Sequence, residues 1–373
     1  MKRLADICDI QYGYAFDSKC FTEDSSYPQL VRIRDVKRGY SETYYSGNYP
    51  DEYILSEGDL LIGMDGEFNI ARWKCSGALL NQRVCKLTTK VGTNEEYLRF
   101  AMLKSLKEIE QRTAFVTVKH LSAKELNKLE LDVPELTKQD KIADTLSRLE
   151  RVIEARKEEL EELDELIKAR FVEMFGDPVS NPYGYDKVAL SDLADIKIGP
   201  FGSLLHKEDY IVGGHPLLNP SHIVDGRISP NNKLTISDEK YKELSAYQLK
   251  TGDVVMGRRG EMGRCAVVSE EGFLCGTGSI LIRTKGEVTA DYIQKTISFP
   301  SFKKTIEDMA VGQTMPNLNV PIVSSFEIIK PPIEVQDRYY ALVEQVDKSK
   351  VKVQKALDET QKLFDSLMQQ YFG

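Results

Sequence analysis

The chain lacks the sequence features of membrane insertion, secretion and structural zinc binding. No apolar run approaches the roughly 20 residues that cross a bilayer. The first residues, MKRLADICDI, have no apolar stretch followed by a small-residue cleavage site. Six cysteines occur among 373 residues, none in a C-x2-C pair, which predicts free thiols in a reducing compartment. We therefore expect a cytoplasmic protein with no membrane partner.

Signatures of catalysis are also missing. The sequence contains no Walker A, H-E-x-x-H or G-x-S-x-G motif. Its four histidines show no metal-ligand spacing. We expect a chain with no catalytic residues, no cofactor of its own and no metal site.

An excess of positive charge, the usual footprint of a nucleic-acid-binding protein, is absent as well. The formal net charge is −8, from 50 Lys and Arg against 58 Asp and Glu, and no region is basic as a whole. Any contact with DNA must therefore come from local clusters of side chains. The length fits two or three domains.

What the chain does contain is an internal repeat. Short motifs of the first half recur in the second half at nearly the same spacing, a little over half the chain. The matched pairs are Phe175-Gly176 with Phe372-Gly373, LADI at 4–7 with LADI at 193–196, GDLLIG at 58–63 with GDVVMG at 252–257, and Gln139-Asp140 with Gln336-Asp337. This pattern predicts a duplicated unit.

Each half closes with a charged segment that carries a heptad seam of apolar residues. In the first segment the seam runs from Ile142 to Met174 and is interrupted at Arg156 and Arg170; in the second it runs from Tyr339 to Tyr371. The second seam is interrupted at Lys350 and Thr360. Narrow seams with charged flanks predict two long helices that pack against each other, although two separate helices remain an alternative.

The regions before these helices combine strand and helix signals. Short apolar runs bounded by Gly and Asp predict strands within 58–64, 252–257 and 278–284, and 95–111 and 290–309 are predicted helical. The predicted fold class is α+β, with two β-rich modules, two long antiparallel coiled-coil helices and a pseudo-twofold internal repeat. The boundaries are 1–135 for the first module, 136–176 for the first helix, 177–332 for the second module and 333–373 for the second helix.

The strongest binding candidate is the loop GRRGEMGR after the Gly-Asp strand of the second half. A guanidinium can donate two parallel hydrogen bonds to O6 and N7 of guanine, and glycines allow a close approach. Its candidate DNA-binding residues are Arg258, Arg259, Glu261 and Arg264. The matching loop of the first half offers Met64, Asp65, Glu67 and Asn69. A solvated turn is the alternative, but different loops predict that the two modules read different bases.

Two further clusters are candidates for DNA contact. One is a pair of short polar loops, with Thr117, Lys119 and His120 in the first half and Thr314 and Asn317 in the second; such loops bind phosphates or base edges, or cap the next element. The other is Arg32 and Arg34, which with Lys37 and Arg38 alternate at strand spacing and predict a basic strand face. An ordinary solvated strand is the alternative there.

Taken together, two modules, two heptad helices and the motifs at their ends resemble the specificity subunit of type I restriction-modification systems. The motifs are LDVPELTKQDKIADTLSRLE and KPPIEVQDRYYALVEQVD at the helix entries and MFGDPVSNPYGY at the first exit. The resemblance implies a non-catalytic subunit whose two target recognition domains each bind one half of a split sequence in double-stranded DNA. It also implies helices that fix the gap, two methyltransferase subunits that carry S-adenosylmethionine, and restriction motor-nuclease subunits.

Two rival functions remain. One is a coiled-coil scaffold that assembles proteins without binding DNA, and unequal arginine-bearing loops at equivalent positions argue against it. The other is an enzyme with a nuclease or methylase centre of its own, which requires a motif that the sequence lacks.

Overall fold

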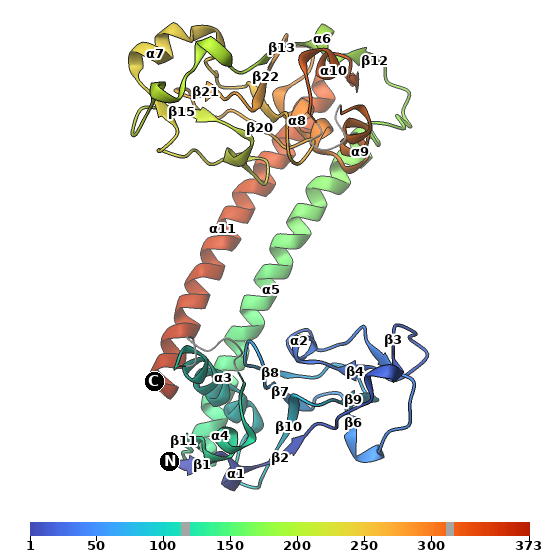
Figure 1. Ribbon diagram of the computed structural model, residues 1–373, viewed down its shortest axis with the longest axis vertical. Helices are drawn as coiled ribbons and strands as arrows, with labels where there is room; N and C mark the ends of the chain where they lie inside the picture. The colour runs from blue at the N-terminus through green and yellow to red at the C-terminus, as the bar shows by residue number, and fades with distance from the viewer. Residues whose placement is uncertain (113–119, 311–316) are drawn as a thin grey trace. The chain divides into compact units, whose positions relative to one another are not determined.

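The computed structural model describes residues 1–112, 120–310 and 317–373. The chain forms two compact units. The first unit consists of residues 1–159 and 353–373, and the second consists of residues 160–352. Two helices of 40 residues, α5 (Leu136–Phe175) and α11 (Ile333–Phe372), contribute a segment to each unit (Figure 1). The predicted long helix in each half is confirmed.

The first unit is built on a four-stranded antiparallel sheet with the order β2-β10-β7-β8. The unit also contains a three-stranded sheet with the order β4-β9-β6 and two strand pairs, β1-β11 and β3-β5. The strands are β1 Lys2–Arg3, β2 Cys8–Tyr12, β3 Phe21–Thr22, β4 Leu30–Val31, β5 Tyr44–Tyr45, β6 Ile54–Leu55, β7 Leu60–Gly63, β8 Asn69–Arg72, β9 Ala78–Leu80, β10 Val84–Thr89 and β11 Glu130–Leu131. The shorter helices are α1 Leu4–Ile7, α2 Ile33–Val36, α3 Glu95–Arg112 and α4 Ala123–Lys128.

The second unit repeats this sheet as β13-β22-β19-β20. A second sheet, β14-β18-β15-β21, and the hairpin β16-β17 extend it, and β12 pairs with β23. The strands are β12 Lys187–Ala189, β13 Ala194–Ile198, β14 Tyr210–Ile211, β15 His215–Leu218, β16 Ile223–Val224, β17 Arg227–Ile228, β18 Thr235–Ile236, β19 Val254–Gly257, β20 Cys265–Val267, β21 Leu274–Cys275, β22 Ser279–Thr284 and β23 Glu327–Ile329. The shorter helices are α6 Leu190–Leu193, α7 Asp238–Glu243, α8 Ala290–Ser298, α9 Pro300–Met309 and α10 Val320–Ser324.

The strand pairing corrects one match of the sequence repeat. Cys8 lies opposite Thr89, and Ala194 lies opposite Thr284. The LADI motif at 4–7, which forms α1, therefore corresponds to α6 at 190–193 and not to the second LADI motif at 193–196. Most of the second LADI motif lies in strand β13. The second unit thus repeats the helical turn of the first, but three residues before the position that the matching sequence motif indicates.

The helix predicted over 290–309 is two helices. Helix α8 begins after Thr289, whose side chain accepts a hydrogen bond from the backbone N–H of Tyr292. It ends at Ser298 because Pro300 disfavours helical backbone at Phe299. Pro300 then occupies the first position of α9, where its missing N–H costs nothing. The helix predicted over 95–111 is confirmed as α3.

The repeated Phe-Gly ends of the two long helices close equivalent cores. In the second unit Phe175 is fully buried and packs edge-on against Tyr292 of α8, with ring centroids 5.0 Å apart. In the first unit Phe372 packs against Tyr97 of α3 at 5.2 Å. Gly176, with φ of 74°, then releases the chain from α5. Each helix therefore ends by completing a module core through its aromatic residue.

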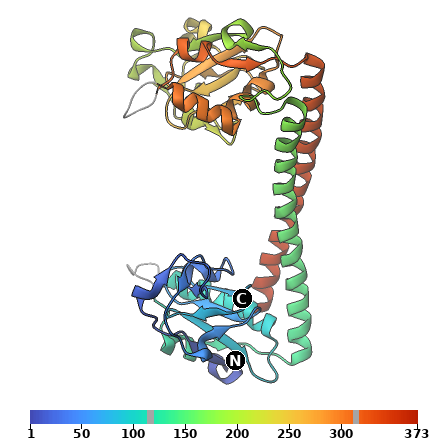
Figure 2. The same ribbon diagram turned by 90° about the vertical axis from the view of Figure 1, so that its right-hand side faces the viewer.

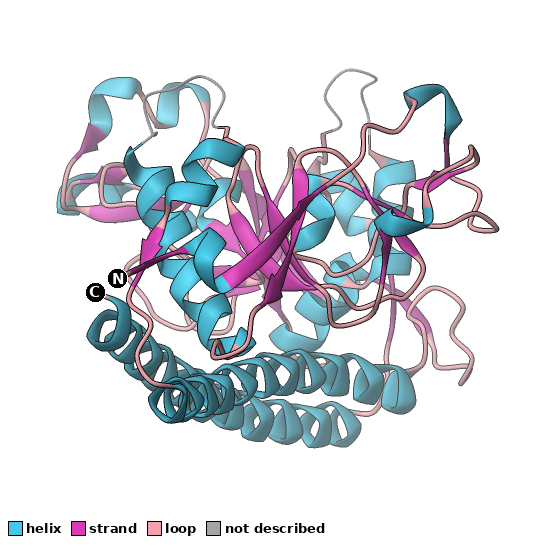
Figure 3. Ribbon diagram, turned by 90° about the horizontal axis from the view of Figure 1, so that it is seen from below, coloured by secondary structure: helices cyan, strands magenta, loops and turns pink. Residues whose placement is uncertain are grey.

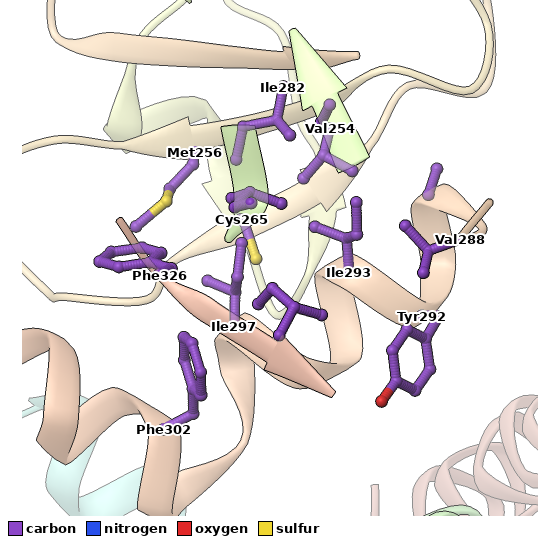
Figure 4. Packing of buried hydrophobic residues seen from close by; sticks show 14 of the residues in the cluster. Val254, Met256, Cys265, Ile282, Val288, Tyr292, Ile293, Ile297, Phe302 and Phe326 are labelled. Atoms are coloured by element: carbon purple, nitrogen blue, oxygen red, sulfur yellow. The ribbon is translucent and has the colours of Figure 1, made fainter. Parts of the chain in front are cut away.

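Apolar side chains from strands and helices interlock in the second unit, as Figure 4 shows. Val254 and Met256 of β19, Cys265 of β20 and Ile282 of β22 come from the sheet. Tyr292, Ile293 and Ile297 of α8 cover them, with Phe302 of α9 nearby. Burial of apolar area of this kind is the main force that stabilises the unit.

Within each unit the segments of α5 and α11 lie side by side and run antiparallel (Figures 1 and 2). In the first unit the Arg156 side chain reaches across to α11 and donates hydrogen bonds to the Ala356 carbonyl oxygen, at 2.5 Å, and to the Thr360 hydroxyl. In the second unit Lys350 pairs with Asp164 at 2.5 Å. Three of the four polar interruptions of the seams are thus partnered across the helix pair.

The fourth predicted interruption, Arg170, is not a position of the apolar seam in the structure. Arg170 forms an ion pair with Glu173 on the helix surface, and Phe171 is buried in its place. Spacing of four residues from Ile167 to Phe171 to Phe175 replaces the heptad there. This shift brings both aromatic rings to the core that Tyr292 and Tyr339 share.

Strands and helices are mixed in both units, which confirms the α+β class (Figure 3). Across the described ranges, no helix combines the length and apolar character needed to span a bilayer. The same ranges hold no group of three or more His, Cys, Asp or Glu side chains arranged to bind a metal ion.

Candidate nucleic-acid interface

Three segments of backbone meet at one place in each unit, which we call the three-segment junction. It comprises residues 64–65, 83 and 120–121 in the first unit and residues 258–259, 278 and 317–318 in the second. In the first unit Met64 N–H donates to the Arg83 carbonyl at 2.9 Å, and Leu121 N–H donates to the Met64 carbonyl at 2.7 Å.

The second unit repeats these bonds. Arg258 N–H donates to the Gly278 carbonyl at 3.0 Å, and Leu318 N–H donates to the Arg258 carbonyl at 2.9 Å. A bridge pairs Asp65 with His120, and its counterpart pairs Arg259 with Asn317. The hydrogen-bond pattern of the junction is therefore the same in both units, although Arg83 has a positive φ and Gly278 does not.

Sequence and local structure explain why these segments meet. Strands β7 and β19 are central strands, buried on both faces, that end at Gly63 and Gly257, so the next two residues follow at the end of the sheet. Ser122 and Asn319 cap the short helices α4 and α10 by accepting hydrogen bonds from backbone N–H groups. These caps fix the residues that precede them, among which are His120 and Asn317.

In the second unit the junction carries two guanidinium groups. Arg258 Nε donates to Asn317 Oδ1 at 3.1 Å, and Arg259 Nε lies 3.4 Å from the same oxygen. Burial and the neighbouring charge of Arg259 lower the pKa of Arg258, but an arginine stays protonated at neutral pH. The Asn317 side-chain oxygen thus contacts both guanidinium groups and orients them.

A cavity of about 550 Å³ opens beside these arginines. Its lining includes Phe201, which is 62% exposed, and Thr277, whose hydroxyl donates to the Pro200 carbonyl at 2.8 Å. An exposed aromatic ring next to guanidinium groups suits stacking and hydrogen bonding to a nucleobase.

Glu261 and Arg264, from the same loop, lie apart from this cavity. Arg264 Nη2 donates to Glu261 Oε2 at 2.6 Å, and Lys303 contacts Glu261 Oε1 at 3.1 Å. These hydrogen bonds lower the pKa of Glu261. Both residues line a larger cavity beside the hairpin β16-β17 instead. The structure therefore divides the loop GRRGEMGR between two places.

In the first unit the junction carries an acid, a histidine and an arginine. His120 Nδ1 lies 2.5 Å from Asp65 Oδ1, and Arg83 Nη1 lies 3.2 Å from Asp65 Oδ2. Met64 contributes its backbone only, because its side chain is 5% exposed and packs in the core. Asp65 and His120 were both expected here, but Arg83 was not.

Glu67 and Asn69 lie farther along the same loop. Glu67 forms an exposed ion pair with Lys37 at 3.3 Å. Asn69 belongs to β8, where its Nδ2 donates to the Glu67 carbonyl at 3.1 Å. The Glu67 side chain thus links the β7-β8 connection to the end of α2, and the Asn69 side chain bonds within that connection.

The predicted basic strand face is wrong. Strand β4 ends at Val31, and residues 33–36 form the helical turn α2. Asp35 causes this, because its buried carboxylate accepts a hydrogen bond from the backbone N–H of Arg32 at 3.0 Å. Arg32 then donates to the Thr43 hydroxyl, and Arg34 is exposed beside Asp35. The two arginines do not share one strand face.

Three other predicted residues, Thr117, Lys119 and Thr314, lie outside the described residues. Sequence reasoning missed Arg83, Phe201 and Thr277. Arg83 and Gly278 are equivalent residues directly before β10 and β22. An alignment of the two repeats that extended through these turns would have identified Arg83.

Comparison with known proteins gives consistent matches. The family model described as "Type I restriction modification DNA specificity domain" matches residues 1–165 and 182–360. The EcoBI specificity subunit of Escherichia coli is 26% identical over 404 residues, covering 99% of this chain and 84% of the relative. The MjaIX specificity subunit of Methanocaldococcus jannaschii is 24% identical over 316 residues, covering 77% and 70%.

Two solved structures share the fold. One is the S subunit of a type I restriction-modification system from M. genitalium, with a TM-score of 0.60, 15% identity and coverage of 100% of this chain and 95% of that one. The other comes from work on complex assembly and conformational transition of a type I R-M system, with a TM-score of 0.60, 18% identity and coverage of 100% and 96%.

Proposed function

The chain belongs to the type I restriction-modification DNA specificity family, and on this premise we propose that its two modules each read one half of a split DNA target. Specificity subunits of these systems recognise DNA and are non-catalytic, so the chain is a DNA-recognition subunit. A coiled-coil scaffold without DNA binding is not favoured.

The observation that carries the proposal is the pair of three-segment junctions. One backbone arrangement presents Arg258, Arg259 and Asn317 in the second unit, and Asp65, Arg83 and His120 in the first. Arginine donors suit guanine, and each junction places arginine beside a polar partner. Equal frames with unequal side chains are what two different half-sites require.

In this proposal residues 1–135 and 177–332 are the reading modules, and 136–176 and 333–373 are spacers. A helix of 40 residues is about 60 Å long, which exceeds the roughly 34 to 36 Å of one DNA turn. The spacers therefore set the unread gap between the half-sites.

The partners follow from the family and are also proposals. Two methyltransferase subunits dock on the chain and hold S-adenosylmethionine, and restriction motor-nuclease subunits complete the complex on double-stranded DNA in the cytoplasm. Because the chain carries a net charge of −8, these partners supply much of the phosphate contact.

Methylome sequencing tests the proposal. A host that expresses the chain with its methyltransferase subunit should show methylation at a motif of two short specific halves around a fixed gap, and deletion of the chain should abolish it. Replacing residues 1–135 with another such module should change one half only. Active methyltransferase with no split motif, or a change in both halves, would contradict the proposal.

A further inference from the structure

We propose that Arg83 reads a guanine in the half-site of the first module, and that Asp65 and His120 hold its guanidinium in position. This inference rests on the proposed function and assigns the base-reading group of one module. The loop GMDGEFNIAR places Met64 and Asp65 at the three-segment junction, so it supplies no arginine there. Arg83 supplies that arginine from another segment.

The contacts fix one edge of the Arg83 side chain. Arg83 Nη1 lies 3.2 Å and 3.4 Å from the two Asp65 carboxylate oxygens. His120 Nδ1 lies 2.5 Å from Asp65 Oδ1, which assigns the Nδ1 proton to that bond. Nδ1 then has no free lone pair for Arg83 Nη1, 3.1 Å away, so the guanidinium donates to the carboxylate.

The opposite edge of the guanidinium remains available. Within the described part of the chain, the hydrogen bonds of this side chain all use Nη1. The side chain is 51% exposed, whereas that of Asp65 is only 21% exposed. Nε and Nη2 therefore present two parallel N–H donors to solvent, the pattern that matches O6 and N7 of guanine in the major groove.

The backbone of Arg83 supports a functional role. Its φ is 70°, in the left-handed region that a side chain disfavours. Asn181 and Asp225 are the other non-glycine residues with positive φ in the described ranges, and their short polar side chains tolerate it. An arginine has no such advantage, and strain of this kind is concentrated at functional sites.

The second unit gives the strongest argument. At the matched positions it has Arg259 in place of Asp65, Gly278 in place of Arg83 and Asn317 in place of His120. Each junction therefore holds an arginine oriented by a polar partner, but different segments supply it. In the first unit it comes from the turn before β10, and in the second from the loop after β19.

The test replaces Arg83 with residues that suit its backbone. Arg83→Gly and Arg83→Asn both accept positive φ, so we expect thermal unfolding at or above the wild-type temperature. Arg3→Asn is the control, because Arg3 is an arginine of the same unit whose side chain is 63% exposed and forms an ion pair with Asp6. Each variant is assembled with the methyltransferase subunit and assayed by methylome sequencing and by binding to a randomised target library.

We expect both Arg83 variants to lose the preference for a G·C pair at one position of the first half-site. Discrimination at that position should fall on the order of 10- to 100-fold, with the second half-site unchanged. Asp65→Asn should weaken the same preference several-fold and leave every other position alone. Arg3→Asn should preserve the whole motif.

Three results would overturn the inference. An unchanged motif, or failure of both Arg83 variants to fold, would make Arg83 a structural ion-pair partner. An equal loss of binding to all sequences would make it a phosphate contact. A wild-type complex with no split motif at all would instead reject the proposed function, so the two failures are distinguishable.

Discussion

The two units share their hydrogen-bonded frame and differ in the charges placed on it. At the entry of each long helix a buried glutamine, Gln139 or Gln336, accepts a hydrogen bond at 2.9 Å from the backbone N–H of the residue before α3 or α8, Asn94 or Thr289. Tyr97 and Tyr292 donate to equivalent carbonyls, of Asp132 and Ile329. The frame holds each module on its helices, whereas the side chains that could distinguish DNA sequences are free to differ.

Charge next to this frame differs as well. In the first unit Arg72 and Arg99 neutralise three acids: Arg72 contacts Glu95 and Glu96, and Arg99 contacts Glu96 and Glu150. In the second unit the places of the two arginines are taken by Val267 and Gln294. The acids Asp291 and Asp347 remain there, and burial raises the pKa of Asp291. One set of acids is compensated by arginine and the other is not.

The largest effect is expected from breaking the shared frame. Gln139 and Gln336 are 0% and 1% exposed, and their amides also donate to the carbonyls of Pro134 and Pro331. Gln139→Ala and Gln336→Ala strand buried polar groups, so each should lower the free energy of unfolding by about 2 to 4 kcal/mol.

Denaturant unfolding measures this loss. Gln354→Ala, on the exposed surface of α11, is the control and should change stability by about 0.5 kcal/mol or less. Strongly unequal losses for the two buried glutamines would show that the frames are not equivalent.

The next largest effect concerns the second junction. Arg258→Ala with Arg259→Ala should cost about 1 to 3 kcal/mol at one base position of the second half-site, because Asn317 orients both groups. A target library assayed with the assembled methyltransferase complex measures this. Arg227→Ala, an exposed arginine of the same unit, is the matched control; a uniform loss over all sequences would make the pair phosphate contacts.

A third effect should have opposite signs in the two units. Burial raises the pKa of Glu96, but Arg99 and Arg72 outweigh it and leave the pKa lowered. The charged form of Glu96 is thus stabilising, so Glu96→Gln should cost about 1 to 2 kcal/mol at pH 7. Asp291, with a raised pKa, is destabilising when charged, and Asp291→Asn should give a gain below about 1 kcal/mol.

The pH dependence follows from these signs. The Glu96 contribution is present above its unfolded pKa and is lost as the pH falls through its lowered folded pKa, so the Glu96→Gln deficit should shrink in acid. The Asp291 contribution is present below its unfolded pKa, about 3.9, and is lost as the pH rises through its raised folded pKa. Unfolding measured between pH 3 and 7 checks both, and like signs at pH 7 would refute the contrast.

The smallest expected effect is a difference in cysteine reactivity between the two units. Burial raises the pKa of Cys8, Cys85, Cys265 and Cys275 to about 12, so these thiols should resist alkylation at pH 8. The two partly exposed cysteines, Cys20 and Cys75, both belong to the first unit. Peptide mapping after brief alkylation should therefore find label in the first unit alone. Rapid labelling of Cys265 or Cys275 would show that the second unit opens.

The sequence predicted the parts of the fold that depend on periodic patterns. Heptads gave both long helices, and the Gly-Asp runs gave β7 and β19, because periodicity reflects the faces that become buried. It failed where one side chain decided the local backbone. Asp35 turned a predicted strand into α2, and Pro300 divided a predicted helix.

The candidate site was predictable only in part, since its members come from separate segments. Arg258, Arg259 and Asn317 were found through loops that repeat in the chain. Arg83 is 18 residues from Asp65 and 37 from His120, and no local motif links them. Strand pairing alone brings these three together, and a single sequence does not display pairing.

The two-part composition of the first unit has a consequence for biosynthesis. Four partly buried residues of α11 pack against its core, Phe364, Leu367, Tyr371 and Phe372, and they leave the ribosome after the entire second unit. The first 159 residues must therefore wait with an incompletely covered apolar face while about half of the protein is still being made, although N-terminal domains usually fold first. We expect the first unit to complete its folding last. A nascent chain stalled before residue 353 should bind chaperones through residues 1–159.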